Sequence, residues 1–219
     1  MKSHDQTQSE YSLYIYGAGG HGKVVLEAAI SEEYPIKGFL DDDCNKWNSE
    51  IVNYPVYGNI YFFDTLDKNK VRIVVAIGNN LLRKTKVIEL SNKGLSYQSV
   101  IHKKAEVSKF SSLGNGSMVI AGAIINIGTQ IGDHVIINTG ATVDHDCMIQ
   151  DFVHIAPGVH MGGEVKVGEG MLVGIGSVVK PGVKIGAWSI IGAGAVVTSN
   201  IPDRVVAVGV PARVIREIK

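Results

Sequence analysis

One histidine of this chain is flanked on both sides by acids, in the run Asp144-His145-Asp146-Cys147. Histidine is the natural side chain for moving a proton near neutral pH. A carboxylate beside it orients the imidazole and stabilises its protonated form, which is the arrangement that a general base needs. The residue types therefore favour a proton-transfer role for His145, while a solvated polar corner with no catalytic part is the alternative interpretation.

A second chemical pattern lies near the start of the chain. Gly17 to Gly22 matches G-x-G-x-x-G after a short apolar strand, and Asp41 follows at about the distance of a ribose-binding acid. Val24 stands where a phosphate loop needs Ser or Thr, which argues against nucleotide hydrolysis. The turn is consistent with backbone amides facing the diphosphate of one nucleotide, with Asp41 or Asp42 accepting from its ribose or base. A tight turn that merely packs a helix on a sheet is the alternative.

A repeat of six residues must position the histidine. Every sixth residue from Ile101 to Val197 is aliphatic, and the residues four places further on are nearly all small or β-branched. A period of six fits neither a helix nor a free strand, so the unit is a short strand plus a corner, which predicts a parallel β-helix. Gly, Asn and Asp follow the aliphatic positions, as at Gly114 and Gly132, where we expect corners that need permissive dihedral angles.

Composition sets limits on function. The 219 residues are 45% hydrophobic, and 21 basic residues balance 21 acidic ones, so no nucleic-acid-binding surface is expected. The apolar runs are too short to insert in a membrane, and the polar start, Met1 to Glu10, is no signal peptide. Two widely separated cysteines, Cys44 and Cys147, favour a reduced, cytoplasmic setting.

The chain divides into four expected parts. These are a polar leader (1–10), a small Rossmann-like α/β domain (11–98), the solenoid (99–201) and a C-terminal cover (202–219). In the α/β domain the patterns predict strands over 13–16, 36–40 and 71–77, helices over 24–30 and 81–92, and a loop with one short strand over 44–57.

The ordered combination of motifs resembles a known family. The glycine turn precedes the hexads, which contain Asp144-His145-Asp146-Cys147 and His154-Ile155-Ala156-Pro157-Gly158, and Gly209-Val210-Pro211-Ala212 follows. This order resembles the sialic-acid O-acetyltransferase family of hexapeptide-repeat acyltransferases. Within it, the chain looks most like the bacterial N-acetyltransferases of nucleotide-linked 4-amino-4,6-dideoxy sugars. The resemblance implies a left-handed parallel β-helix with three hexads per coil.

The resemblance also implies roles for particular residues. His145 matches the catalytic base and Asp146 the acid behind it, while His154 matches a histidine near the acetyl thioester and Gly163 an amide that contacts coenzyme A. Positions that line the sugar nucleotide match Gly19, Gly20, His21, Asp41 and Asp42. Acetyl-CoA would be the cosubstrate, no metal is expected, and the product would enter a bacterial surface glycan such as the O-antigen of lipopolysaccharide.

The coil length relates these residues in space. Gly163 follows His145 by 18 residues, one full coil, so its backbone should lie about 5 Å away in the next layer. His154 is half a coil from His145 and therefore on the opposite side of the prism. If both histidines serve one site, that site lies between neighbouring prisms, which implies a closed homo-oligomer, most simply a homotrimer.

Three other functions stay open at this point. The first is O-acetylation of sialic acid or another free sugar. The second is a zinc carbonic anhydrase, with His134 and His154 facing outwards and His145 of a neighbour completing the metal site. The third is a non-enzymatic scaffold.

Overall fold

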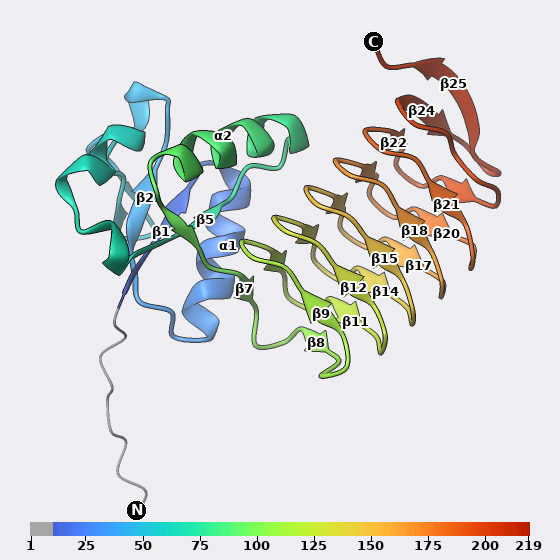
Figure 1. The fold of residues 1–219 in the computed structure, drawn as a ribbon, viewed down its shortest axis with the longest axis horizontal. Helices are drawn as coiled ribbons and strands as arrows, with labels where there is room; N and C mark the ends of the chain where they lie inside the picture. The colour runs from blue at the N-terminus through green and yellow to red at the C-terminus, as the bar shows by residue number, and fades with distance from the viewer. Residues whose placement is uncertain (1–10) are drawn as a thin grey trace, which may run out of the picture.

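We describe the protein from a computed structural model, which defines residues 11–219; the expected leader, 1–10, lies outside the described residues. The first part is a parallel four-stranded sheet in the order β2-β1-β5-β6 with two long helices (Figure 1). Its elements are β1 (Ser12–Tyr16), α1 (Gly20–Ser31), β2 (Ile36–Leu40), β5 (Val71–Val75), α2 (Asn80–Asn92) and β6 (Ser96–Tyr97). Within residues 11–219 no helix is long and apolar enough to cross a bilayer.

Several boundaries in this part differ from the sequence-based prediction. Helix α1 begins at Gly20 rather than Val24, so the second half of the glycine turn forms the first helical turn, and β5 ends at Val75 rather than Ile77. The expected loop with one strand holds a hairpin of two strands and a 3₁₀ helix, and two more 3₁₀ helices follow. These elements are η1 (Cys44–Lys46), β3 (Glu50–Ile51), β4 (Tyr54–Pro55), η2 (Ile60–Thr65) and η3 (Lys68–Lys70).

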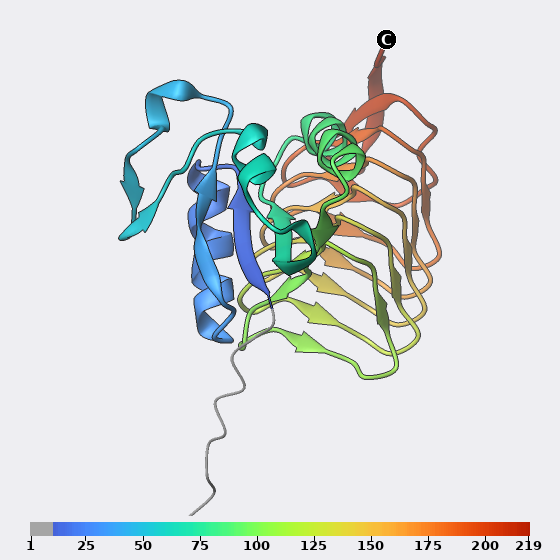
Figure 2. The same ribbon diagram turned by 60° about the vertical axis from the view of Figure 1, so that its left-hand side comes forward.

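The second part is a three-sided solenoid, as predicted (Figure 2). Each strand pairs in parallel with the strand 18 residues further on, for example Ile137 with Ile155, so three hexads make one coil. The eight-stranded face contains β7 (Val100–Ile101), β10 (Met118–Val119), β13 (Ile136–Ile137), β16 (His154–Ile155), β19 (Leu172–Val173), β22 (Ile190–Ile191), β24 (Val205–Val208) and β25 (Arg213–Glu217).

The two other faces are shorter. The six-stranded face contains β8 (Glu106–Val107), β11 (Ile124–Ile125), β14 (Thr142–Val143), β17 (His160–Met161), β20 (Val178–Val179) and β23 (Val196–Val197). The five-stranded face contains β9 (Ser112–Leu113), β12 (Gln130–Ile131), β15 (Met148–Ile149), β18 (Lys166–Val167) and β21 (Lys184–Ile185). The aliphatic residue that ends each strand points into the prism, and together with the small residues of the corners these side chains form one continuous core.

The corners correct one detail of the sequence interpretation. The left-handed backbone lies three places after each aliphatic residue, as at His134, Asp146 and Gly158, and not directly after it. A glycine directly after the aliphatic residue serves close approach instead: a Cβ on Gly114 would lie 2.4 Å from the carbonyl of Gly132 in the next coil. The backbones of stacked corners therefore meet at this position, where only glycine leaves enough room.

The α/β domain lies on the eight-stranded face. The residue before the core residue points outwards there, and at Val100, Met118 and Ile136 this outward side chain is apolar and fully buried against residues of α1 and β1. These positions recur at 18 residues, one per coil, so the sequence already contained a signal that one face of the prism is covered. Farther along the same face the outward residues are His154 and Leu172, at the edge of the covered area.

Candidate active site

His145 lies at the corner after β14, where its side chain is half-exposed. Its Nδ1 lies 2.9 Å from Oδ2 of Asp146, and its backbone N–H donates to Oδ1 of Asp144 at 2.8 Å. The hydrogen bond to Asp146, assisted by the charges of Asp144, Asp146 and Glu164, raises the pKa of His145. Nδ1 is thus engaged by a carboxylate and Nε2 is left to exchange a proton, as a general base requires.

Gly163 lies beside this imidazole in the next coil. A Cβ at position 163 would be 2.5 Å from the ring of His145, so any side chain here would displace the imidazole. The Gly163 amide makes no hydrogen bond within residues 11–219, whereas the amide of His145, at the same corner one coil earlier, is capped by the Asp144 side chain. Gly162 replaces that aspartate, so the Gly163 N–H stays available to a ligand.

His154 lies on the eight-stranded face, a different face from the one that leads to His145, as coil counting predicted. Its Nδ1 is 3.2 Å from the carbonyl oxygen of Gly78, and its Nε2 is 3.1 Å from Nδ2 of Asn138. A carbonyl only accepts, so Nδ1 carries the proton and Nε2 accepts from Asn138. Burial, assisted by the charge of Arg83, lowers the pKa of His154 to about 4, so the ring is neutral at physiological pH.

His21, in the first turn of α1, meets His154 across the junction of the two parts. The ring centroids are 6.2 Å apart, and Nε2 of His21 is buried without a hydrogen-bond partner. Burial, followed by the effects of His154 and Arg83, lowers the pKa of His21 to about 4. The glycine turn of the α/β domain and the solenoid therefore form one continuous site rather than two separate ones.

The remaining residues of the glycine turn differ in accessibility. Gly19 and Gly20 are exposed, and Gly19 is the N-cap of α1 with no side chain capping that helix end. A Cβ added at either glycine would meet nothing within 4 Å. The N-terminal amides of α1 consequently face open space, where the helix dipole favours an anion such as a phosphate.

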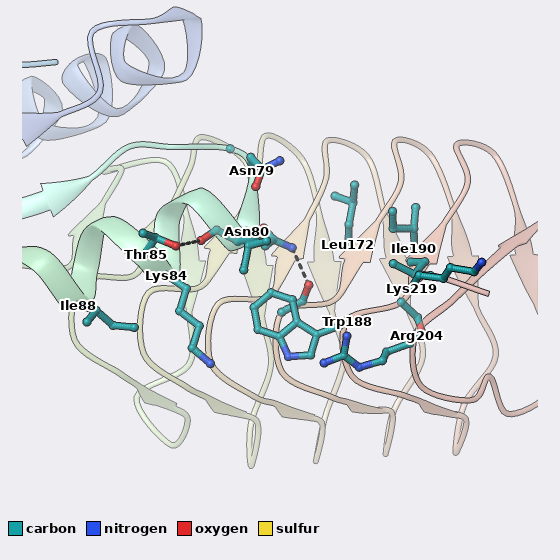
Figure 3. A pocket seen from close by; sticks show the side chains of 15 residues that line it. Asn79, Asn80, Lys84, Thr85, Ile88, Leu172, Trp188, Ile190, Arg204 and Lys219 are labelled. Carbon is teal, nitrogen blue, oxygen red and sulfur yellow. Dashed lines mark hydrogen bonds between the residues drawn. The ribbon is translucent and has the colours of Figure 1, made fainter. Parts of the chain in front are cut away.

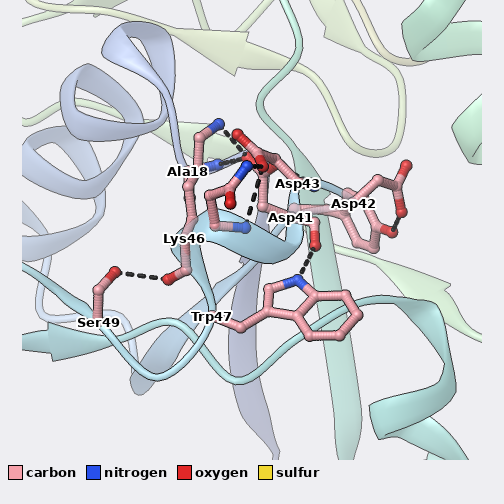
Figure 4. Close-up of polar contacts among 9 residues, drawn as sticks. Ala18, Asp41, Asp42, Asp43, Lys46, Trp47 and Ser49 are labelled. Carbon is pink, nitrogen blue, oxygen red and sulfur yellow. Dashed lines mark hydrogen bonds and ion pairs between the residues drawn. The ribbon is translucent and has the colours of Figure 1, made fainter.

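Asp41 and Asp42, the predicted nucleotide-binding acids, both have partners within the chain. Asp41 accepts from the amides of Ala18 and Asp43 at 2.8 and 2.9 Å and from Nζ of Lys46 at 2.9 Å (Figure 4). Burial acts to raise the pKa of Asp41, but these hydrogen bonds outweigh it and the pKa is lowered. The Asp41 carboxylate thus fixes the shape of the glycine turn, and the sequence interpretation missed Lys46 beside it.

Asp42 points the other way, into a polar cluster. One carboxylate oxygen accepts from the hydroxyl of Tyr16 at 2.5 Å, and the other pairs with Nζ of Lys86 at 2.8 Å. Burial and the bond to Asp42 raise the pKa of Tyr16. The Asp42 side chain is still more than half-exposed, so a ligand can reach it.

Arg83 is a residue of this region that no sequence motif indicated. It is fully buried at the junction, where it donates to the carbonyls of Ile77 at 2.8 Å, His134 at 2.9 Å and Phe152 at 2.7 Å. It makes no ion pair with any described residue, and burial lowers its pKa to about 9. The guanidinium links one backbone segment of the α/β domain to two successive coils of the solenoid, and its charge helps to keep His21 and His154 neutral.

The structure contradicts the outward orientation expected of His134. This side chain is buried, its ring stacked on Phe152 and edge-on to Tyr97. It sits at a left-handed corner next to the α/β domain, which explains why counting residues alone placed it wrongly. Among residues 11–219, no three His, Cys, Asp or Glu side chains are grouped so as to hold a metal ion.

Comparison with known proteins agrees with this architecture. Residues 12–90 match the PglD N-terminal domain, and residues 164–199 match the bacterial transferase hexapeptide of six repeats. The acetyltransferase domain of PglB from Neisseria gonorrhoeae, solved in complex with acetyl coenzyme A, is 36% identical. The match covers 93% of this chain and 98% of that one, with a TM-score of 0.87. The chain belongs to the hexapeptide-repeat nucleotide-sugar N-acetyltransferases.

Other members of this acetyltransferase family agree along nearly the whole chain. GDP-perosamine N-acetyltransferase from Caulobacter crescentus, solved with CoA and GDP-perosamine, is 38% identical over 94% of this chain and 97% of that one, with a TM-score of 0.87. WeeI from Acinetobacter baumannii is 27% identical over 94% of this chain and 100% of that one, with a TM-score of 0.86. This acetyltransferase therefore shares both the α/β domain and the left-handed β-helix of its relatives.

Proposed function

We propose that this enzyme transfers the acetyl group of acetyl-CoA to the C4 amino group of a nucleotide-linked 4-amino-4,6-dideoxyhexose. The observation that carries this proposal is the contact between His21 and His154, with ring centroids 6.2 Å apart. It joins the phosphate-accepting end of α1 to the solenoid surface where the family resemblance puts the thioester. A sugar held by the glycine turn through its nucleotide can thus present its amino group at His154.

The proposed chemistry is direct transfer. His145 takes a proton from the sugar amine, the nitrogen attacks the thioester carbonyl, the carbon–sulfur bond breaks, and the proton passes to the departing thiolate of CoA. The free Gly163 N–H is a suitable donor to the acyl carbonyl. His154 is not such a donor, because its Nδ1–H is engaged by Gly78 and its Nε2 is an acceptor.

We further propose a homotrimer in which His145 of one subunit completes the site at His154 of the next. The support is that the two histidines belong to different faces of one prism. Between them, on the six-stranded face and its corners, lie the exposed apolar side chains Ile124, Ile127, Ile175 and Val178. An apolar strip of this kind suits a contact between copies of the chain.

Coexpression of two inactive variants tests this arrangement. Chains carrying His145→Ala and chains carrying His154→Ala should each be nearly inactive alone. In mixed trimers roughly a quarter of the interfaces would combine two native histidines, so activity should return to about that level. If each site lay within a single chain, no activity would return, and a monomer that acetylates would contradict the trimer altogether.

A substrate panel tests the reaction itself. CoA release is measured with UDP-, GDP- and dTDP-linked 4-amino-4,6-dideoxy sugars and with free sialic acid. Transfer to one nucleotide amino sugar supports the proposal, whereas transfer to sialic acid alone would replace it with O-acetylation. We assign the enzyme to the cytoplasm and to the synthesis of a surface glycan such as the O-antigen, because both cysteines are free thiols. Fractionation of the native cells would check the location.

A further inference from the structure

A groove lies between the first turns of α2 and the last coils of the eight-stranded face (Figure 3). It encloses about 630 Å³. Apolar side chains form its floor at Leu172 and Ile190, and the indole of Trp188 lies along it. The groove is separate from the glycine turn, and none of the residues predicted for the active site lines it.

The charges around the groove are of one sign. Lys84, Arg204 and Lys219 line it, and no Asp or Glu does. The Lys84 ammonium is already paired with Glu169 at 2.6 Å and lies 5.2 Å from the ring centroid of Trp188. The Arg204 guanidinium makes no hydrogen bond or ion pair with any residue of 11–219, so its charge is free for a ligand.

The amino end of α2 also faces the groove. The side chain of Asn80 is buried, and Nδ2 donates to the carbonyls of Gly170 and Met171 at 3.0 and 2.9 Å. Its Oδ1 is buried without a hydrogen-bond partner among the described residues. A helix of 13 residues with its positive end at this point adds to the field of the cations, so the groove favours an anion.

The groove leads from the proposed acetyl site to the free cation. Gly78, whose carbonyl holds His154, lines one end of it. Along the face, His154 pairs with Leu172, Leu172 with Ile190, and Ile190 with Val206, which lies two residues from Arg204. Three strand spacings amount to about 14 Å. An apolar floor of this length therefore separates an acyl-transfer position from a free positive charge.

We propose that this groove binds the pantetheine arm and the phosphorylated nucleotide end of acetyl-CoA, with Arg204 contacting a phosphate and Trp188 stacking on the adenine. The inference rests on the proposed acetyl transfer and adds the residues that would recognise the donor. Leu172 and Ile190 would support the arm, which spans such a distance when extended. The sugar nucleotide is the poorer occupant, because it has no long flexible arm to cover this floor.

The test compares two donors and two arginines. Arg204→Ala should raise the KM for acetyl-CoA by roughly tenfold to a hundredfold, since charge-assisted hydrogen bonds are lost, and leave kcat nearly unchanged. The KM for acetyl-pantetheine, which lacks every phosphate that Arg204 would contact except by extension of the arm, should not change. Arg216→Ala is the matched control, because Arg216 is an exposed arginine of β25 outside the groove.

A variant of the floor gives a second readout. Ile190→Trp should fill the groove and raise the KM for both donors, while the thermal midpoint stays near that of the native protein. A native KM for acetyl-CoA in Arg204→Ala, or an equal rise for both donors, would overturn the assignment of Arg204.

Calorimetry separates this proposal from the proposed function. Acetyl-CoA binding can be measured without any acceptor sugar, so the Kd of Arg204→Ala tests the groove even if the acceptor is not the expected one. A Kd weakened by the same factor supports the groove. An unchanged Kd overturns the groove alone, and a native protein that does not bind acetyl-CoA overturns both.

Discussion

The imidazoles of His21 and His154 face each other across the junction of the α/β domain and the solenoid, with their ring centroids 6.2 Å apart. Neither ring has a carboxylate partner, and both are held neutral by burial and by the nearby charge of Arg83. His145 is the opposite case, because its neighbours are acids and its pKa is raised. The enzyme thus separates histidines that stay neutral from one that can take up a proton.

His145→Asn should lower kcat by roughly 10² to 10⁴, because the general base is lost while the corner keeps its shape. The measurement is steady-state CoA release, with the oligomeric state and thermal midpoint as controls. A variant that retains near-native kcat would remove His145 from the mechanism.

The pH profile should depend on Asp146. Activity requires neutral His145, so it should fall as the pH drops through the raised pKa of this residue, above the ordinary value of 6.5. Asp146→Asn removes the charge and should move the acidic limb of kcat/KM to lower pH. Asparagine suits the left-handed backbone at this corner, where φ is 58°, so the fold should be unchanged. An unmoved acidic limb would mean that another group sets the profile.

Gly163→Ala should impair catalysis without unfolding the protein. The new Cβ would lie 2.5 Å from the His145 ring, and this exposed ring can move aside at little cost in stability. We expect kcat to fall by roughly tenfold or more, since small displacements of a catalytic group are costly. Native kcat with an unchanged His145 NMR shift would show that the two residues do not touch in solution.

Stability should fall in acid because three histidines are buried neutral. His21, His134 and His154 each have a pKa of about 4 in the folded protein against 6.5 for a free side chain. The unfolded chain therefore binds more protons between these values, so stability rises with pH there and is lost as the pH falls. Each contributes at most about 3 kcal/mol. Urea unfolding at pH 7 and pH 5 measures the sum, and equal stability at both would contradict the burial.

Cys147→Ser should remain active. The thiol is fully buried in the solenoid core, and burial raises its pKa, so it is a poor nucleophile. Rapid-quench analysis should show no burst of acetyl-enzyme in either the native or the variant protein. A burst that disappears in the variant would replace direct attack with an acyl-cysteine intermediate.

The sequence by itself determined the solenoid and the relation of His145 to Gly163. Both follow from a local rule repeated along the chain: one aliphatic residue in six fills the core, and 18 residues return the chain to the same corner one layer higher. A relation of this kind needs no knowledge of any other part of the molecule, and the first strands of the α/β domain were equally local.

Only the tertiary structure decided how the two parts meet. The contact of His21 with His154, the burial of Arg83 and the inward ring of His134 all depend on which face of the prism the α/β domain covers. So do the partners of Asp41 and Asp42, which come from segments distant in sequence. These relations arise from side chains packing across an interface without a repeat, and no periodicity along the chain encodes such an interface.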